Sequence, residues 1–298
     1  QLGRALSMSR NNIKIGVILQ GAETPFMKEV LKGIQEACAE VDNLGGTVLV
    51  HKIEHQNAED VILAMEKMRM EEVRGIAMVP LDEERVKREI DRFVEEFRIP
   101  VVTFTSDVED TKRLCFVGQN GVQCGRAAAG LMGELTGGKG KVAVISGYST
   151  NTSLSSRVVG FREEIARKYP GIEIIGPEYC FEENGRAREI TEGIFKEVPD
   201  LDGIYLTSHG EEGVCEAIAG ARKAGRVKMV ANDFMGRNYE LMRGGFIHFL
   251  IGQDARIQGY EPVMILFRLL FNGEAPERAK IFTEIYIRNE YTIPEGRH

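Results

Sequence analysis

Three aspartates in this 298-residue chain follow short apolar segments that are typical of buried strands. Asp82, Asp107 and Asp233 therefore lie where catalytic carboxylates often lie, just beyond a strand. No nucleophile or general base accompanies them in a recognisable string, because G-x-G-x-x-G after a strand, G-x-x-x-x-G-K-[ST], H-E-x-x-H and G-x-S-x-G do not occur. We expect the chain not to be an enzyme, and an α/β enzyme stays open as an alternative because such folds host many activities.

Cysteine and histidine are the residues that would bind a transition metal or form disulfides. The five cysteines are Cys38, Cys115, Cys124, Cys180 and Cys215. They are scattered, odd in number and without a C-x-x-C pair, which is typical of reduced core thiols in a cytosolic protein. The five histidines are dispersed as well. The sequence therefore predicts no metal, no cofactor and a cytoplasmic location.

Composition limits the partners. The net charge of −7 argues against a nucleic-acid surface within these residues. No apolar run reaches the length of a membrane span, and no signal-peptide pattern precedes Ile13. We expect a globular protein that does not contact a membrane, with one large or two medium domains.

Two distant stretches of the chain share one layout. The first runs from KIGVILQGAETPFMKEVLKGIQEACAE into GGTVLVHK, and the second from KVAVISGYSTNTSLSSRVVGFREEIARKYP into GIEIIGPEYC. Each consists of an apolar run, a polar loop, an amphipathic segment and a second apolar run. This repeat predicts two similar α/β lobes, each a parallel sheet flanked by helices, with strand-end loops that face each other across a ligand cleft.

Apolar runs of strand length alternate with helical patterns along the whole chain. Strands suited to burial on both faces are expected at Ile13–Leu19, Val48–His51, Ile76–Val79, Val101–Phe104, Val142–Ile145, Ile172–Ile175, Ile204–Leu206, Val227–Val230 and His248–Ile251, and a late strand at Ile281–Ile287. Helices are expected at Ser153–Lys168, Gly185–Glu197, Glu211–Ala224 and Ala255–Phe271.

Three crossings between the lobes are expected, near Val117–Gly121, Gly252–Asp254 and Lys280–Thr283. They make both lobes discontinuous. The predicted domains are residues 13–118 plus 254–281 for the N-terminal lobe and 119–253 plus 282–298 for the C-terminal lobe, with residues 1–12 as a remnant of a linker.

Five strings in matching order resemble the periplasmic-binding-protein type I fold, shared by ribose-binding proteins and the sensor domains of LacI/GalR-family transcription regulators. They are IKIGVILQGAETPFMKEVLKGI, SSRVVGF, VANDF, IGQDARIQGYEPV and FNGEAP. The resemblance covers the chain from Ile13 to the C-terminus.

This resemblance implies a polyhydroxylated ligand, whose hydroxyls require bidentate charged or amide groups and whose C–H faces suit an aromatic platform. It places Arg157 and Asp233 as a polar clamp on ring hydroxyls, Gln253 at a hinge, and Phe26 and Phe181 beside the ring. Each has an ordinary alternative: a surface ion pair for the arginine, a turn or cap for the aspartate, the core for the phenylalanines. Arg157→Ala or Asp233→Ala should weaken binding with folding largely kept.

Departures from the ribose-binder pattern make ribose itself doubtful. Thr105 and Ser106 replace an acidic–basic pair, Thr24 replaces a common asparagine, and Ser208 lies where an amide is expected. We retain Thr105 and Ser208 as predicted ligand-binding residues. His209 follows Ser208 and could donate to a ligand, although such an imidazole more often lies on the surface or in a core.

The polar, basic lead-in QLGRALSMSRNN resembles the end of the hinge that joins the DNA-binding segment of LacI/GalR regulators to their sensor domain. An ordinary terminus is the alternative. On this resemblance we expect a LacI-family effector-sensing domain that binds a sugar or polyol, couples lobe closure to operator DNA through a segment absent from this chain, and forms a homodimer. The alternative function is a free sugar-binding protein of a transport system.

Overall fold

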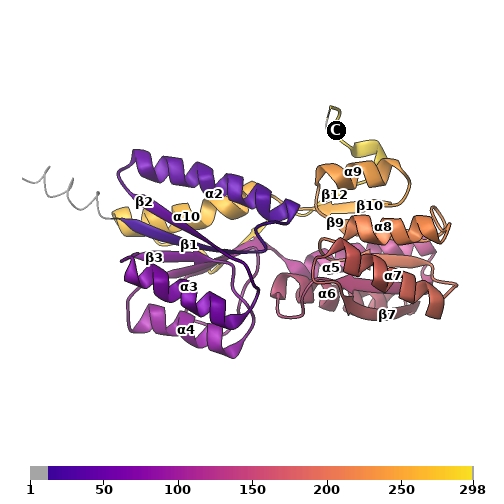
Figure 1. Ribbon diagram of the computed structural model, residues 1–298, viewed down its shortest axis with the longest axis horizontal. Coiled ribbons are helices and arrows are strands. Elements are labelled where there is room, and N and C mark those ends of the chain that lie inside the picture. Colours follow the sequence, from indigo (N-terminus) through magenta and orange to yellow (C-terminus); the bar gives the residue numbers. More distant parts are fainter. Residues whose placement is uncertain (1–12, 297–298) are drawn as a thin grey trace, which may run out of the picture. The chain divides into compact units, whose positions relative to one another are not determined.

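A computed structural model describes residues 13–296, which form two compact units (Figure 1). Unit 1 comprises residues 13–118 and 254–283, and unit 2 comprises residues 119–253 and 284–296. The chain thus passes between the units after residues 118, 253 and 283, where the sequence analysis placed the boundaries after 118, 253 and 281. The expected linker remnant, residues 1–12, lies outside the described residues.

Unit 1 is built on a six-stranded sheet with the order β11-β5-β4-β3-β1-β2. Its strands are β1 (Lys14–Gln20), β2 (Thr47–Ile53), β3 (Gly75–Met78), β4 (Val101–Phe104), β5 (Cys115–Gln119) and β11 (Lys280–Thr283). Its helices are α2 (Pro25–Asn43), α3 (Ala58–Met70), α4 (Glu84–Glu95) and α10 (Ala255–Asn272). Strands β1 to β5 pair in parallel with their neighbours, as buried βαβ units do.

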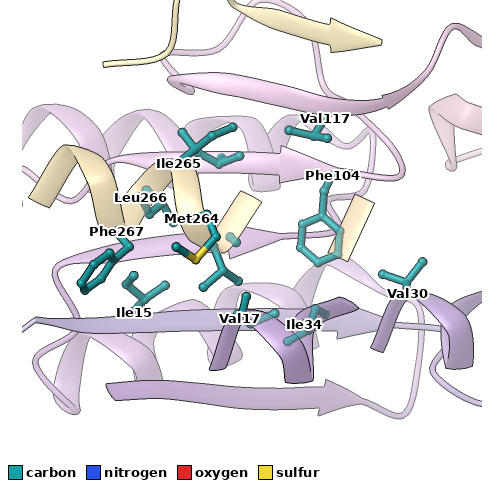
Figure 2. Close-up of a cluster of buried hydrophobic side chains, with 14 of the residues drawn as sticks. Ile15, Val17, Val30, Ile34, Phe104, Val117, Met264, Ile265, Leu266 and Phe267 are labelled. Atoms are coloured by element: carbon teal, nitrogen blue, oxygen red, sulfur yellow. The ribbon is translucent and has the colours of Figure 1, made fainter. Parts of the chain in front are cut away.

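The helices of unit 1 cover both faces of its sheet, because strand side chains alternate between the faces. Ile15 and Val17 of β1 pack in the core beneath α2 and α10, whereas Ile18 packs against α3 and α4. Figure 2 shows the first core, in which Phe104 and Val117 from two strands lie near the α10 side chains Met264–Phe267. A late helix therefore completes a core that begins with the first strand.

Unit 2 repeats this plan with the strand order β12-β10-β9-β8-β6-β7. Its strands are β6 (Lys139–Ser146), β7 (Gly171–Tyr179), β8 (Gly203–Leu206), β9 (Lys228–Asn232), β10 (Phe249–Gly252) and β12 (Tyr286–Arg288). Its helices are α5 (Gly121–Thr136), α6 (Thr152–Lys168), α7 (Asn184–Glu197), α8 (Glu211–Gly220), α9 (Gly236–Arg243) and the short 3-10 helix η1 (Glu290–Thr292). Val142 and Val144 of β6 face α5 and α6, and Ala143 and Ile145 face the opposite core.

Each unit holds one pair of helices in close contact through reciprocal glycines. In unit 2, a Cβ on Gly125 of α5 would lie 2.0 Å from the Arg157 carbonyl oxygen, and one on Gly160 of α6 would lie 2.0 Å from that of Val122. In unit 1, Gly33 of α2 and Gly259 of α10 approach the other helix equally closely. Only glycine allows backbones to approach this closely, and the contact fixes Arg157 against α5.

Two strand predictions were wrong. The stretch Ile281–Ile287 is not one strand, because the chain crosses between the units at Glu284 and contributes β11 to one sheet and β12 to the other. Strand β12 pairs antiparallel with β10, so the unit 2 sheet is not wholly parallel. Val48–His51 is not buried on both faces: β2 is an edge strand, and Val50 is 40% exposed. Strand β5 and helices α5 and α9 were not anticipated.

No helix within residues 13–296 combines the length and the apolar character needed to cross a membrane. No group of three or more His, Cys, Asp or Glu side chains in that range could hold a metal ion.

Candidate ligand-binding site

Arg157 is a buried cation held by neutral oxygen atoms. It lies in the second turn of α6, whose first residues are capped when the Asn151 side chain accepts from the Leu154 N–H. The residue is only 2% exposed. Its Nη1 donates to the Thr207 carbonyl oxygen (2.5 Å) and its Nη2 to Gln119 Oε1 (3.0 Å). Its Nε–H is buried without a hydrogen-bond acceptor among the described residues, so the group keeps donors that the protein does not use.

Asp233 directly follows β9 and is 9% exposed. Its backbone N–H donates to the Ile251 carbonyl oxygen (2.8 Å), and Gln253 Nε2 donates to its Oδ1 (3.2 Å). Burial raises the pKa of the Asp233 carboxyl, an effect opposed by the positive charge of Arg157 and by the Gln253 hydrogen bond. Asp233 and Gln253 thus lie together, and Asp233 does not cap α9, which begins after Met235.

Gln119 joins these groups. Its Oε1 accepts from Arg157, and its Nε2 donates to the Gly252 carbonyl oxygen (3.2 Å), one residue before Gln253. Gln119 ends β5 and is the first residue of unit 2. An amide can accept and donate at once, which lets one side chain hold both the arginine and the strand that leads to Gln253.

Hydroxyl groups complete the polar edge. Thr207, the residue after β8, shares a hydrogen bond of 2.7 Å with Ser146 at the end of β6. The predicted site residue Ser208 is buried, and its Oγ donates to the His209 carbonyl oxygen (3.5 Å). Because the carboxyl ends of parallel strands share one edge of a sheet, these residues lie at the same edge as Asp233.

The aromatic residue Phe181 follows β7 and is 45% exposed. Its ring lies 5.5 Å from that of Tyr148, at an angle of 51°. The prediction that Phe181 could be a core residue is therefore excluded. An exposed Phe181 ring paired with the partly buried Tyr148 ring is suited to cover the C–H face of a sugar.

Phe26 and Thr105 belong to unit 1. Phe26 is the second residue of α2 and packs, partly buried, against the core of that unit. Thr105 follows β4 and donates its N–H to the Val117 carbonyl oxygen (3.0 Å). Gln20 is the last residue of β1 in the same sheet, and its Nε2 donates to the Val79 carbonyl oxygen (2.6 Å). Its Oε1 is buried and accepts no hydrogen bond among the described residues.

Three of the seven predicted site residues have a left-handed backbone. The φ angles are 58° at Thr105, 53° at Phe181 and 77° at Asp233. Residues other than glycine adopt this conformation at a cost of about 1–3 kcal/mol, and such residues gather at binding and active sites. The same conformation also occurs at residues that only end helices or form turns, such as Glu72, Arg98 and Arg222, so it does not by itself mark a site.

Gln119, Thr207 and Tyr148 were not predicted as site residues from the sequence. Gln119 and Thr207 each follow an apolar strand run, and that placement was the available signal. Tyr148 lies in the loop after β6, where only its spatial neighbour Phe181 gives it a role. As a whole, the edge of unit 2 presents a cation, a carboxylate, amides, hydroxyls and aromatic rings, a set that recognises adjacent hydroxyl groups.

Residues 15–275 match the periplasmic binding protein domain family, and the chain belongs to this family. The D-allose-binding periplasmic protein of Escherichia coli strain K12 is 23% identical over 248 residues, covering 80% of this chain and 78% of that protein. The D-ribose/D-allose-binding protein of Pseudomonas aeruginosa is 25% identical over 230 residues, covering 74% and 70%.

Solved structures agree with the fold. An ABC transporter solute-binding protein from Agrobacterium vitis with bound D-fucose is 25% identical, with a TM-score of 0.88 and coverage of 95% of this chain and 97% of that chain. The predicted fold class, two α/β lobes of the periplasmic-binding-protein type, is thereby confirmed.

These findings contradict the predicted LacI-family function and the keywords of transcription regulation, because the relatives are sugar-binding proteins, one of them named periplasmic. LacI/GalR sensor domains and sugar-binding proteins share the fold, so the prediction of a regulator instead of a sugar-binding protein depended on residues 1–12 alone. The comparisons support neither operator DNA nor a homodimer as partner. The homodimer was expected to use apolar side chains of residues 73–76 and 81–86, yet Val73, Ile76, Leu81 and Val86 are at most 4% exposed within unit 1.

The predicted cytoplasmic location is contradicted by the same relatives. It depended on the unpaired cysteines, and the structure shows why that argument fails. All five are free thiols, and four are buried. Burial raises the pKa of Cys115 and of Cys180 to about 11, and raises that of Cys124 and Cys215 as well. Protonated, buried thiols react slowly with oxidants, so free cysteines do not identify a reducing compartment.

Proposed function

We propose that this chain is the sugar-binding component of a transport system outside the cytoplasm, and that it binds a small neutral monosaccharide or polyol without converting it. The carrying observation is the polar edge of unit 2, where Arg157, Gln119, Asp233 and Gln253 form one connected set. Membership of the periplasmic binding protein family and sugar-binding relatives support the same ligand class.

The residues suit a diol. Arg157 can only donate and Asp233, when ionised, can only accept, whereas neighbouring sugar hydroxyls do both. Phe181 and Tyr148 add an apolar surface at the same edge. Phe26 and Thr105 remain predicted ligand-binding residues of unit 1.

Isothermal titration calorimetry with a panel of sugars tests the proposal. The panel contains D-allose, D-ribose, D-fucose, D-glucose and a linear polyol, with the uncharged disaccharide sucrose as a size control. We expect one-to-one binding of at least one monosaccharide or polyol, and recovery of the sugar chemically unchanged by NMR after incubation. Absence of binding by the whole panel at millimolar concentration, or conversion of a sugar, would contradict the proposed function.

Asp233→Ala should abolish most of the binding, and Asp42→Ala is the matched control because Asp42 is an exposed aspartate of unit 1. Equal affinity in both variants would show that the sugar binds elsewhere.

A further inference from the structure

His209 is a partly exposed imidazole at the same edge of the unit 2 sheet. It lies between β8 and α8, two residues after the Thr207 carbonyl that accepts from Arg157. Its side chain is 25% exposed, while that of Glu211 is 5% exposed. The Cys180 thiol, from the loop after β7, donates to the His209 carbonyl oxygen (3.5 Å), so neighbouring loops hold the backbone here.

Glu211 orients the ring. His209 Nδ1 lies 2.9 Å from Glu211 Oε2, and the same oxygen accepts from the Gly210 N–H (3.1 Å). The other oxygen, Oε1, accepts from Asn238 Nδ2 (3.2 Å), which also donates to the carbonyl oxygen of Asp233 (3.0 Å). Because a buried carboxylate can only accept, Nδ1 carries the proton and Nε2 is the free end of the ring.

Nε2 of His209 makes no hydrogen bond within residues 13–296 and is not among the buried polar atoms that lack a partner. The ring is therefore fixed at one nitrogen and available at the other. Asn238 ties this arrangement to Asp233, so His209 and Asp233 belong to one hydrogen-bonded edge.

We propose that His209 is a further ligand-contacting residue of this site, with Glu211 as a positioning residue that turns Nε2 toward a sugar oxygen. The inference rests on the proposed sugar-binding function and deepens it, because a protonated Nε2 donates a charge-assisted hydrogen bond, whereas a neutral one can only accept.

The charges that face His209 define the ligand class and the pH dependence. The ring contacts Glu211 and feels the negative charges of Glu212 from α8, Glu182 from the loop after β7 and Asp233 after β9. The hydrogen bond to Glu211 raises the pKa of His209, an effect opposed by desolvation and reinforced by the charge of Glu182. This acidic surrounding favours neutral sugars over their uronic acid counterparts.

The protonation state of His209 sets the sign of the pH effect. The strong donor exists below the pKa of His209 and is lost as pH rises through it, so sugar affinity falls with rising pH. Charged hydrogen bonds are roughly twice as strong as neutral ones, and we expect a fall of about three- to tenfold across the transition. Asp233 titrates too, but its protonation removes an acceptor and gives a dependence of opposite sign.

Calorimetry from pH 5.5 to 8.5, in pairs of buffers with different ionisation enthalpies, tests the proposal with the sugar that binds the wild type. We expect proton uptake on binding, loss of the pH-dependent fall in His209→Gln, and a shift of that fall to lower pH in Glu211→Gln. His209→Ala should lose about tenfold in affinity at low pH. His55→Gln is the control, because His55 is an exposed histidine of unit 1.

Histidine NMR of the wild type should show the Nε2 resonance of His209 move on addition of the sugar. Equal affinity and an unchanged pH profile in His209→Gln, with no movement of that resonance, would overturn the inference and leave the proposed function intact. A uronic acid that binds more tightly than the neutral sugar would overturn the ligand class. If no sugar binds the wild type, both the proposed function and the inference are wrong.

Discussion

At the scale of single residues, the candidate site combines buried charges that do not form a direct ion pair. Arg157 is held by the Thr207 carbonyl and the Gln119 amide, and Asp233 by the Gln253 amide. Neutral partners leave both charges able to interact with a ligand, but they compensate desolvation less completely than an opposite charge would. We therefore expect these two buried charges to lower the folding stability of the ligand-free protein while they remain available to a ligand.

Asp233→Asn should separate the effect of the Asp233 charge on folding stability from its effect on sugar binding. Because burial raises the pKa of Asp233 in the folded state, its contribution to stability is most favourable below the unfolded pKa and is lost as pH rises through the folded pKa. At pH 7 the amide variant should therefore unfold roughly 2–4 °C higher without sugar, while its sugar affinity falls by about 2–5 kcal/mol. Differential scanning calorimetry measures the melting temperature and titration calorimetry measures the sugar affinity, with Asp42→Asn as the control variant for both. A lower melting temperature would contradict the argument from desolvation.

Arg157→Ala should cost folding stability as well as binding. The sequence suggested that folding would be largely kept, but the side chain is buried and its removal leaves the Thr207 carbonyl and Gln119 without their donor. We expect the free energy of unfolding to fall by about 3 kcal/mol in urea denaturation. Arg167→Ala, which changes an exposed arginine of the same helix, should leave it unchanged. Equal stability of the two variants would show that Arg157 contributes to binding alone.

Motifs identified some site residues and could not identify others. Arg157, Asp233 and Gln253 stand within strings whose order predicted the fold, and the structure connects all three through one edge of unit 2. Gln119 is separated from Arg157 by 38 residues. No local pattern marks such a pairing, because it arises only when the strand order of the folded sheet brings the two segments together. The left-handed φ of Thr105, Phe181 and Asp233 is likewise a property of the fold rather than of the residue types.

At the scale of elements, the reciprocal glycines position α6 and hence Arg157. Gly125→Ala would place a methyl group 2.0 Å from the Arg157 carbonyl oxygen, so α5 and α6 would have to separate. We expect a loss of about 1–3 kcal/mol in unfolding free energy and weaker sugar binding.

Gly130 provides the control within the same helix, because a Cβ there would meet nothing within 4 Å. Gly130→Ala should be neutral or stabilising by up to about 1 kcal/mol. Similar effects of the two variants would mean that helix propensity, and not the close contact, governs this helix pair.

Most elements were predictable because buried parallel strands give continuous apolar runs and their helices give a clear 3.6-residue period. Strand β5 was missed because its apolar run, CFV, is only three residues long and is followed by a glycine, which is typical of a turn. The division of the last apolar stretch into β11 and β12 could not be predicted, because it depends on which sheet edge each half reaches.

At the scale of the whole molecule, ligand binding should stabilise the folded state by mass action. A sugar present at 100 times its dissociation constant adds about 2.7 kcal/mol to the free energy of unfolding. Thermal unfolding with increasing sugar should show a continuous rise in the melting temperature of the wild type and little rise in Asp233→Ala. A rise of the same size in both would place the binding site elsewhere.

The order in which the chain is synthesised has a consequence for how it folds. Helix α10 and strand β11 complete the core and sheet of unit 1, yet they follow the long segment of unit 2 in the sequence. A nascent chain that has reached residue 253 contains five of the six strands of each sheet, but the part of the unit 1 sheet beside α2, over β3 and β4, still lacks its covering helix α10. Unit 2 can therefore form its native core before unit 1, although unit 2 begins later in the sequence. Until α10 has been synthesised, residues 13–118 expose apolar surface to chaperones and proteases.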